Sequence, residues 1–399
     1  MKIGIIKEGK TPPDKRVILN PEQCKKIQEL YKNVHIKVES SQIRCISDDE
    51  YAKEGIEVSS DISDCDIFLG IKEVPVSQLI ANKTYMFFSH TIKLQEYNIK
   101  LLKEIINKNI KLIDYEVITD INAKRLIGFG KYAGIAGAYS GFRAVGQKLK
   151  IYDIRRADQI GTRRGIDEEM KKVKLPPNFK IVMTGDGRVT SGATEVIQTL
   201  GIKKVGFQEF ITDNFDEPVY TSLRSKDFYK AKENKWIRQD FYDNPHNYSS
   251  DFDKYTKVAD MYIACHYWNP KAEMIMTKEE MKSPDFKIKV IADISCDING
   301  PIPSTTRSST ITEPFYGYDP ILEKEVDFNN ENSIGVMAVD NLPCELPADA
   351  SKEFGDEFIE YVLPNLVGED KDQIIERATI TENGKLTERY QFMQVMLQG

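Results

Sequence analysis

The chain of 399 residues is long enough for two ordinary domains, and 41% hydrophobic with 29% charged residues is typical of a globular protein. The net charge of −7 argues against a nucleic-acid surface, which usually carries clustered positive charge. No apolar run is long enough for a membrane span or a signal peptide, so we predict a cytoplasmic protein with no membrane segment.

The first third of the chain alternates short apolar runs with segments of helical periodicity. Residues 21–31 and 95–107 carry apolar side chains at helical spacing. Strands are predicted at residues 3–6, 34–38, 67–71, 84–88 and 111–113. This alternation indicates parallel β-α-β units in an open, doubly wound sheet.

The middle of the chain begins with a stretch of small residues, 128–138, where helices or a ligand can approach the backbone closely. The helix that follows, to about residue 150, is expected to cross between domains. Residues 153–177 are polar and arginine-rich, and we interpret them as an excursion or loop. Residues 212–256 are polar and aromatic without a clear period, which suggests an insertion.

A second α/β pattern predicts strands at residues 180–184, 203–207, 259–265 and 287–294. An amphipathic helix at residues 348–362 could return the chain to the first domain. We therefore predict an α/β protein of two doubly wound Rossmann-like domains, with mostly parallel sheets and a cleft between them. Residues 1–138 with 340–399 would form a discontinuous substrate-binding domain, and residues 139–339 a dinucleotide-binding domain.

A glycine turn after the strand at 180–184 carries the cofactor signal. Strand, turn, helix and a delayed acid together form the dinucleotide-binding pattern, although the usual third glycine position holds Thr190. The acid, Glu209, would bind ribose hydroxyls and favours NAD, whereas Arg188 or a nearby lysine could meet the 2′-phosphate of NADP. NAD and NADP both stay open. The expected cofactor residues here are Gly185, Gly187, Arg188, Val189, Gly192 and Glu209.

His90 is one of only four histidines, and it lies between Lys72 and Lys93 in the sequence. An imidazole flanked by lysines suits chemistry on a substrate that exchanges protons near neutral pH. A lysine can also act as a base where burial or a neighbouring cation lowers its pKa. By themselves, these residues could equally be a structural histidine and solvated surface charges. The six cysteines lack C-x-x-C spacing, so we expect reduced thiols and no metal site.

Several motifs together resemble the alanine dehydrogenase and transhydrogenase N-domain superfamily. Within it, the chain most resembles lysine-forming saccharopine dehydrogenase and the lysine-ketoglutarate reductase domain. The resemblance runs nearly end to end, and its more specific marks are LIDYE at 112–116 and FGKYAGIAG at 129–137. The other matching segments are KRV at 15–17, GIK at 70–72, FSHTIK at 88–93, DISCD at 293–297, VDNLP at 339–343 and ELP at 345–347.

The resemblance implies an NAD(P)-dependent oxidoreductase of lysine metabolism. It would interconvert saccharopine and water with lysine and 2-oxoglutarate, with an imine intermediate. Lys72 would accept the proton of the secondary amine, and His90 would serve as acid–base group for water addition and collapse of the adduct. Because the implied substrate has several carboxylates, cations should line the cleft, and the candidates are Arg16, Lys93 and Arg125. Glu116 could hold one of the lysines or receive the substrate ammonium. Asp340 falls on a matching motif and could contact the cofactor, fix the hinge or make a structural hydrogen bond.

Two other functions remain open at this point. One is an alanine-dehydrogenase-like enzyme that acts on a small amino acid. The other is a non-catalytic nucleotide-binding domain of the transhydrogenase type. For each, small molecules are the expected partners, nucleic acid is not, and self-association into a homo-oligomer is open.

Overall fold

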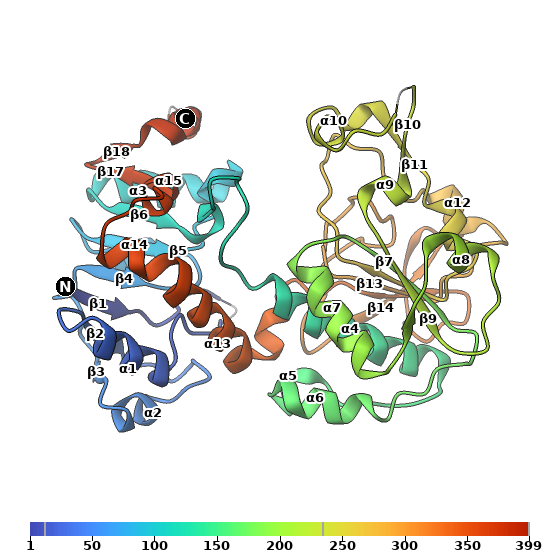
Figure 1. The fold of residues 1–399 in the computed structure, drawn as a ribbon, viewed down its shortest axis with the longest axis horizontal. Helices are drawn as coiled ribbons and strands as arrows, with labels where there is room; N and C mark the ends of the chain where they lie inside the picture. The colour runs from blue at the N-terminus through green and yellow to red at the C-terminus, as the bar shows by residue number, and fades with distance from the viewer. Residues whose placement is uncertain (12, 234, 398–399) are drawn as a thin grey trace. The chain divides into compact units, whose positions relative to one another are not determined.

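The computed structural model describes residues 1–11, 13–233 and 235–397. The chain divides into two compact units, one formed by Met1–Phe129 with Pro347–Gly399 and the other by Gly130–Leu346. Each unit is built around an eight-stranded, mostly parallel sheet with helices packed against it (Figure 1). The predicted α/β architecture with two Rossmann-like sheets is therefore confirmed.

The sheet of the first unit is parallel at its centre and antiparallel at one edge. Its strands run in the order β18-β17-β6-β5-β4-β1-β2-β3, and only the pairings of β17 with β6 and β18 are antiparallel among the described strands. The adjacent strands β6, β5, β4 and β1 are parallel, so their carboxyl ends meet at one edge of the sheet. The bounds are β1 Lys2–Ile5, β2 His35–Glu39, β3 Glu57–Ser59, β4 Ile67–Leu69, β5 Thr84–Phe87, β6 Lys111–Asp114, β17 Thr379–Glu382 and β18 Lys385–Leu386.

The helices of the first unit come from both ends of the chain. A reciprocal pair of side-chain hydrogen bonds between Asn20 and Gln23 caps the first helix, α1. Figure 1 draws α13 and α14, at the red end of the colour scale, across the blue strands of the same unit. Phe354 of α13 stacks on Phe129 with ring centroids 4.5 Å apart, which ties the C-terminal segment to this core. The bounds are α1 Pro21–Leu30, α2 Asp48–Lys53, α3 Ile99–Asn107, α13 Pro347–Glu357, α14 Leu363–Val367 and α15 Ile374–Ala378.

The sheet of the second unit has β7 and β12 near its centre. Its strands run in the order β15-β14-β16-β13-β12-β7-β9-β8, and β14 pairs antiparallel with both β15 and β16, whereas the other described pairings in this sheet are parallel. A separate antiparallel hairpin, β10–β11, lies outside this sheet. The bounds are β7 Lys180–Thr184, β8 Lys203–Lys204, β9 Val219–Leu223, β10 Tyr229–Ala231, β11 Tyr248–Ser250, β12 Met261–Ala264, β13 Val290–Asp293, β14 Phe315–Asp319, β15 Lys324–Val326 and β16 Ile334–Met337.

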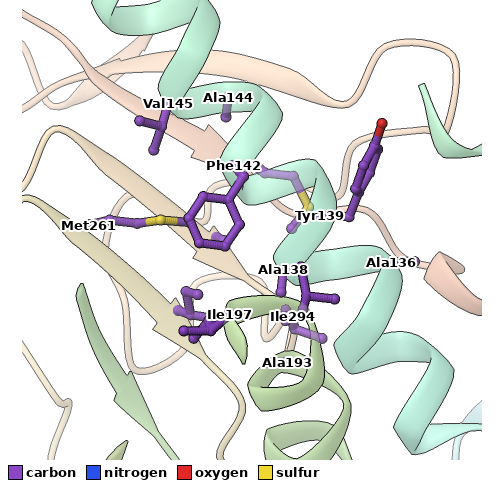
Figure 2. Close-up of a cluster of buried hydrophobic side chains, with 14 of the residues drawn as sticks. Ala136, Ala138, Tyr139, Phe142, Ala144, Val145, Ala193, Ile197, Met261 and Ile294 are labelled. Atoms are coloured by element: carbon purple, nitrogen blue, oxygen red, sulfur yellow. The ribbon is translucent and has the colours of Figure 1, made fainter. Parts of the chain in front are cut away.

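The long helix α4 (Gly130–Leu149) and the helix α7 (Arg188–Thr199) cross at very close range. A Cβ on Gly134 would lie 1.9 Å from the carbonyl oxygen of Val189, so the backbones can meet only at a glycine. Figure 2 shows Phe142 of α4 and Ile197 of α7 in the core beside Met261. The other helices are α5 Ala157–Ile160, α6 Arg163–Met170, α8 Phe207–Thr212, α9 Ser225–Phe228, α10 Arg238–Asp243, α11 Asp253–Thr256 and α12 Lys278–Lys282.

Two segments interpreted as irregular contain regular elements. Residues 153–177 hold α5 and α6, and the supposed insertion at 212–256 supplies β9, which pairs with β7 in the main sheet. β9 was not predicted from the sequence because its residues, VYTSL, include hydroxyl side chains and so lack the apolar run expected of a buried strand. The Thr221 hydroxyl is buried and donates to the carbonyl of Val205, which satisfies it inside the sheet. Among the described residues, no helix is long and apolar enough to cross a membrane.

Candidate functional site

The carboxyl edge of the first sheet gathers most of the sequence-predicted catalytic and substrate-binding residues. Lys72 follows β4, His90 follows β5 and Glu116 follows β6. The segment after β1 contributes Glu8 and Lys10, which contact the segment after β4. Loops at this edge of a parallel sheet are where α/β proteins bind ligands.

His90 is held by an acid that the sequence did not single out. Its Nδ1 lies 2.6 Å from Oε1 of Glu73, and Oε2 of Glu73 lies 2.8 Å from Nζ of Lys10. Burial acts to raise the pKa of Glu73, but the hydrogen bonds from His90 and Lys10 keep it at about 2. An ionised carboxylate accepts hydrogen bonds, so His90 donates from Nδ1 and its Nε2 is left to exchange protons with a ligand.

Lys72 lies in a segment whose backbone is fixed by a buried acid. The two oxygens of Glu8 accept hydrogen bonds from the backbone N–H of Ile71 at 2.6 Å and of Lys72 at 2.9 Å. Burial raises the pKa of Glu8 to about 7. Burial also lowers the pKa of the Lys72 ammonium, and the nearby cation of Arg16 lowers it further. Both effects weaken the hold of Lys72 on its proton.

Arg16 is buried and already engaged by a protein carboxylate. Its Nε and Nη2 donate to Asp14 at 3.0 and 2.6 Å, and its guanidinium lies 4.2 Å from the ring centroid of Phe129. This bidentate pair fixes the guanidinium rigidly. Arg16 therefore acts on Lys72 through its positive charge, whatever else it binds.

Glu116 brings together the two other predicted cations of the first unit. Its Oε1 lies 3.5 Å from Nζ of Lys93 and 3.4 Å from Nη2 of Arg125. Both cations are about half exposed, at 45% and 46%, whereas Glu116 is 14% exposed. Long, exposed ion pairs contribute little to stability, so both cations can turn toward the carboxylates of a ligand.

The glycine turn of the second unit joins β7 to α7. Gly185 has φ +114°, and a Cβ there would lie 2.6 Å from the carbonyl oxygen of Cys265, so a side chain does not fit. Gly187 is the N-cap of α7, and a Cβ on it would meet no atom within 4 Å. This open approach to the first turn of a helix, at Arg188 and Val189, fits the pyrophosphate of a dinucleotide.

The remaining sequence-predicted cofactor residues are Gly192, Glu209 and Asp340. Gly192 is buried within α7, where a Cβ would lie 1.9 Å from the carbonyl oxygen of Lys131 in α4, so its glycine serves the helix crossing. Glu209 is exposed in α8, and its carboxylate accepts the N–H of Gly206 at 2.8 Å. Asp340 is exposed after β16.

A strand that the sequence did not predict, β9, ends next to the glycine turn. β7 lies between β12 and β9, and the carbonyl of the last residue of β9, Leu223, accepts the N–H of Gly185 at 2.9 Å. The chain then continues with Arg224, Ser225 and Lys226. In dinucleotide folds, the residue after this strand meets the adenosine ribose. Arg224 is exposed there, beside the glycine turn.

Sequence reasoning missed Glu8, Lys10, Asp14 and Glu73 as residues of the first unit's site. Each is an ordinary charged residue in a polar segment, and none carries a spacing signal of its own. The available signal was their position just after a predicted strand, shared with Lys72. Their pairing with His90, Lys72 and Arg16 appears only once the strands are placed side by side.

Comparisons with known proteins agree with this fold. Residues 4–136 match the family described as alanine dehydrogenase/PNT, N-terminal domain. Among solved structures, an L-alanine dehydrogenase covers 100% of the chain and 100% of its own with a TM-score of 0.67 at 17% identity. A transhydrogenase from Sinorhizobium meliloti covers 97% of the chain and 100% of its own with a TM-score of 0.63 at 16% identity. At these identities the two structures establish the fold alone.

The sequence relatives are more specific. The chain is 29% identical over 433 residues to the mitochondrial alpha-aminoadipic semialdehyde synthase of Mus musculus. This alignment covers 96% of the chain and 46% of the mouse protein. It is 25% identical to the NAD(+), L-lysine-forming saccharopine dehydrogenase of Emericella nidulans, over 92% of the chain and 91% of that protein.

The chain spans about half the length of the semialdehyde synthases that it matches. Together with the family match and the fold, these relatives confirm the resemblance to the alanine dehydrogenase and transhydrogenase superfamily, with lysine-forming saccharopine dehydrogenases among its relatives. The mouse relative is named as mitochondrial, so the cytoplasmic location of this chain stays a prediction.

Proposed function

We propose that the chain is a nicotinamide-dependent oxidoreductase that interconverts saccharopine, oxidised cofactor and water with lysine, 2-oxoglutarate and reduced cofactor. The observation that carries the proposal is a half-buried lysine with a lowered pKa in the same loop cluster as a histidine bonded to an ionised acid. Amine oxidation followed by imine hydrolysis needs one base for the amine proton and a second acid–base group for water. The saccharopine dehydrogenases among the relatives support the choice of substrate.

In the oxidative direction, Lys72 accepts the proton of the secondary amine as hydride leaves the adjacent glutarate carbon. When bound, the nicotinamide ring supplies the two-electron acceptor for that hydride. His90 then takes a proton from water as its oxygen adds to the imine carbon. Lys72 returns its proton to the imine nitrogen during this addition, so the adduct is a neutral carbinolamine. His90 then gives its proton to the nitrogen as the carbon–nitrogen bond breaks, and Lys72 takes the hydroxyl proton of the adduct as the carbonyl forms, which releases lysine and 2-oxoglutarate. Lys93 and Arg125 bind substrate carboxylates, and Glu116 binds an ammonium group.

For the cofactor, we propose a preference for NADP(H) over NAD(H). Gly185 and Gly187 would admit the pyrophosphate to the amino end of α7, where Arg188 and Val189 lie. An acid after the second strand selects the free 2′-hydroxyl of NAD, whereas an arginine accommodates the 2′-phosphate of NADP. Arg224 holds that position, which favours NADP(H) and leaves Glu209 outside the site.

The decisive assay follows consumption of reduced cofactor with lysine and 2-oxoglutarate. Turnover with this pair supports the proposal, and a response only to pyruvate with ammonia would instead identify an alanine-dehydrogenase-like enzyme. In the oxidative direction, kcat/KM should fall as the pH is lowered, because Lys72 becomes protonated and cannot accept the amine proton. Lys72→Met should lose most of the activity, and the activity that remains should no longer fall as the pH is lowered. Lys32→Met, which changes an exposed lysine after α1, is the matched control.

A further inference from the structure

Three hydrogen-bond donors converge on the buried carboxylate of Asp114, the last residue of β6. Its Oδ2 accepts from the backbone N–H of Ser89 at 3.1 Å and, in a short hydrogen bond, from the Ser89 hydroxyl. Its Oδ1 accepts from the backbone N–H of Glu116 at 2.8 Å. Ser89 precedes His90 after β5, and Glu116 follows β6, so a single carboxylate joins the two loops that carry them.

The backbone of His90 needs such an anchor. His90 has φ +54° and ψ +8°, a left-handed conformation that is uncommon outside glycine. Such a conformation is strained for a residue with a Cβ and persists only where the surrounding contacts hold it. On one side, Thr91 donates its N–H to the Ser89 hydroxyl oxygen at 3.2 Å, and on the other, the Asn98 amide donates to the His90 carbonyl at 3.1 Å.

The carboxylate of Asp114 is fully buried, so its hydrogen bonds must offset the cost of removing it from water. Asp114 and Ser89 have no exposed surface, and Thr91 has none either. Burial raises the pKa of Asp114 to about 6, although the hydrogen bonds from Ser89 oppose that change. A carboxylate is costly to bury unless its bonds are made. Here two of the three bonds come from Ser89, which precedes His90, and the third comes from the backbone N–H of Glu116.

We propose that Asp114 is a positioning residue, whose carboxylate holds the left-handed turn at His90 through Ser89 and so keeps the His90 ring against Glu73. Through the Glu116 amide it also fixes the acid that pairs with Lys93 and Arg125. Asp114 touches no reacting atom in this scheme. The expected effect of Asp114 on kcat rests on the proposed function. Its role in holding the His90 turn does not depend on which substrate the protein uses.

Asp114→Asn tests the inference, because the amide replaces one acceptor oxygen by an NH2 group that faces donors. A displacement of about 1 Å at His90 is expected to lower kcat about 10- to 100-fold. The affinity for NADPH alone, measured by fluorescence titration, should not change, because the glycine turn lies in the other unit. Ser89→Ala removes the hydroxyl and keeps the backbone N–H, so its loss of kcat should be smaller. This variant tests the same contact if Asp114→Asn does not fold.

Asp319→Asn is the matched control. Asp319 is also a buried aspartate at the end of a strand, and its Oδ1 accepts the N–H groups of Ile321 and Leu322 at 2.9 and 3.0 Å in the second unit. It should lose stability without a change in kcat. Because the chain has only four histidines, their imidazole signals can be followed by NMR and the one from His90 assigned with His90→Ala.

In Asp114→Asn the NMR signal of the hydrogen-bonded Nδ1 proton of His90 should shift or disappear, and Glu73→Ala, which removes the acceptor of that proton, is expected to have the same effect. A second readout is the double variant with His90→Ala, whose kcat should hardly fall below that of His90→Ala alone. An unchanged Nδ1 signal, or losses that multiply in the double variant, would overturn the inference. If the wild type does not turn over lysine with 2-oxoglutarate, the proposed function fails, and the NMR comparison still decides the role of Asp114.

Discussion

At the scale of single residues, the charge of a side chain was readable from the sequence but its partner was not. Lys72 and His90 were proposed from their types and a resemblance. The structure adds Glu73, which lies beside Lys72 in sequence yet bonds to His90. A carboxylate in a polar segment is usually a solvated surface charge, so nothing local distinguishes it. The pairing depends on the neighbouring positions of β4 and β5.

The cofactor position illustrates the same limit, and it can be tested at one residue. Arg224→Ala should lower kcat/KM for NADPH about 10- to 100-fold, because a charge-assisted hydrogen bond contributes roughly 1.5–3 kcal/mol. The value for NADH should barely change, since that cofactor lacks the 2′-phosphate. Steady-state kinetics with both cofactors measure the ratio of kcat/KM for NADPH to kcat/KM for NADH.

Glu209→Gln separates the two interpretations of the ribose position. It should not change the ratio of kcat/KM for NADPH to that for NADH, because Glu209 is exposed and caps α8. A fall in NADH use by that variant, with no effect of Arg224→Ala, would restore the acid expected from the sequence.

At the scale of elements, the most consequential difference lies in the order of strands in the second sheet. The strand expected at 203–207 is reduced to Lys203–Lys204 at the edge, and β9 enters between it and β7. Periodicity favoured the wrong segment because Thr221 and Ser222 interrupt the apolar run of β9. The glycine turn was recognised correctly as strand, turn and helix, since those signals are local.

The crossing of α4 and α7 gives an element-scale prediction. Gly134→Ser should lower the free energy of unfolding by at least about 1–3 kcal/mol, because its Cβ would collide with the Val189 backbone and force the helices apart. Chemical denaturation measures the loss. Gly187→Ser is the matched comparison, since its Cβ meets open space and serine suits an N-cap. Equal stability of the two variants would contradict the close crossing.

At the scale of the whole molecule, the two units differ in how their cores are assembled. The second unit is one continuous segment, whereas the first depends on residues from both ends of the chain. Phe354 and Phe358 are fully buried in its core, and β17 pairs with β6. The amphipathic helix read from the sequence at 348–362 coincides with α13 and the π-helical turn Phe358–Val362 that follows it.

This difference predicts the behaviour of fragments. Residues 130–346 should fold alone with a cooperative thermal transition and bind NADPH, because they hold a complete sheet and core. Residues 1–129 should not fold cooperatively, because the buried rings of α13 and the strand partner of β6 are missing. Circular dichroism and NADPH fluorescence distinguish these outcomes. A stable fragment 1–129 would show that the C-terminal segment is dispensable.

The sequence by itself determined the α/β class, two mostly parallel sheets, the glycine turn and the family resemblance, because these rest on periodicity and short local motifs. The tertiary structure decided which strand lies beside β7 and which acids hold Lys72 and His90. Those features depend on the neighbours of each strand in the sheet, and such neighbours are distant in sequence. The left-handed turn at His90 belongs to the same group, since Asp114, which anchors it, comes from the next strand.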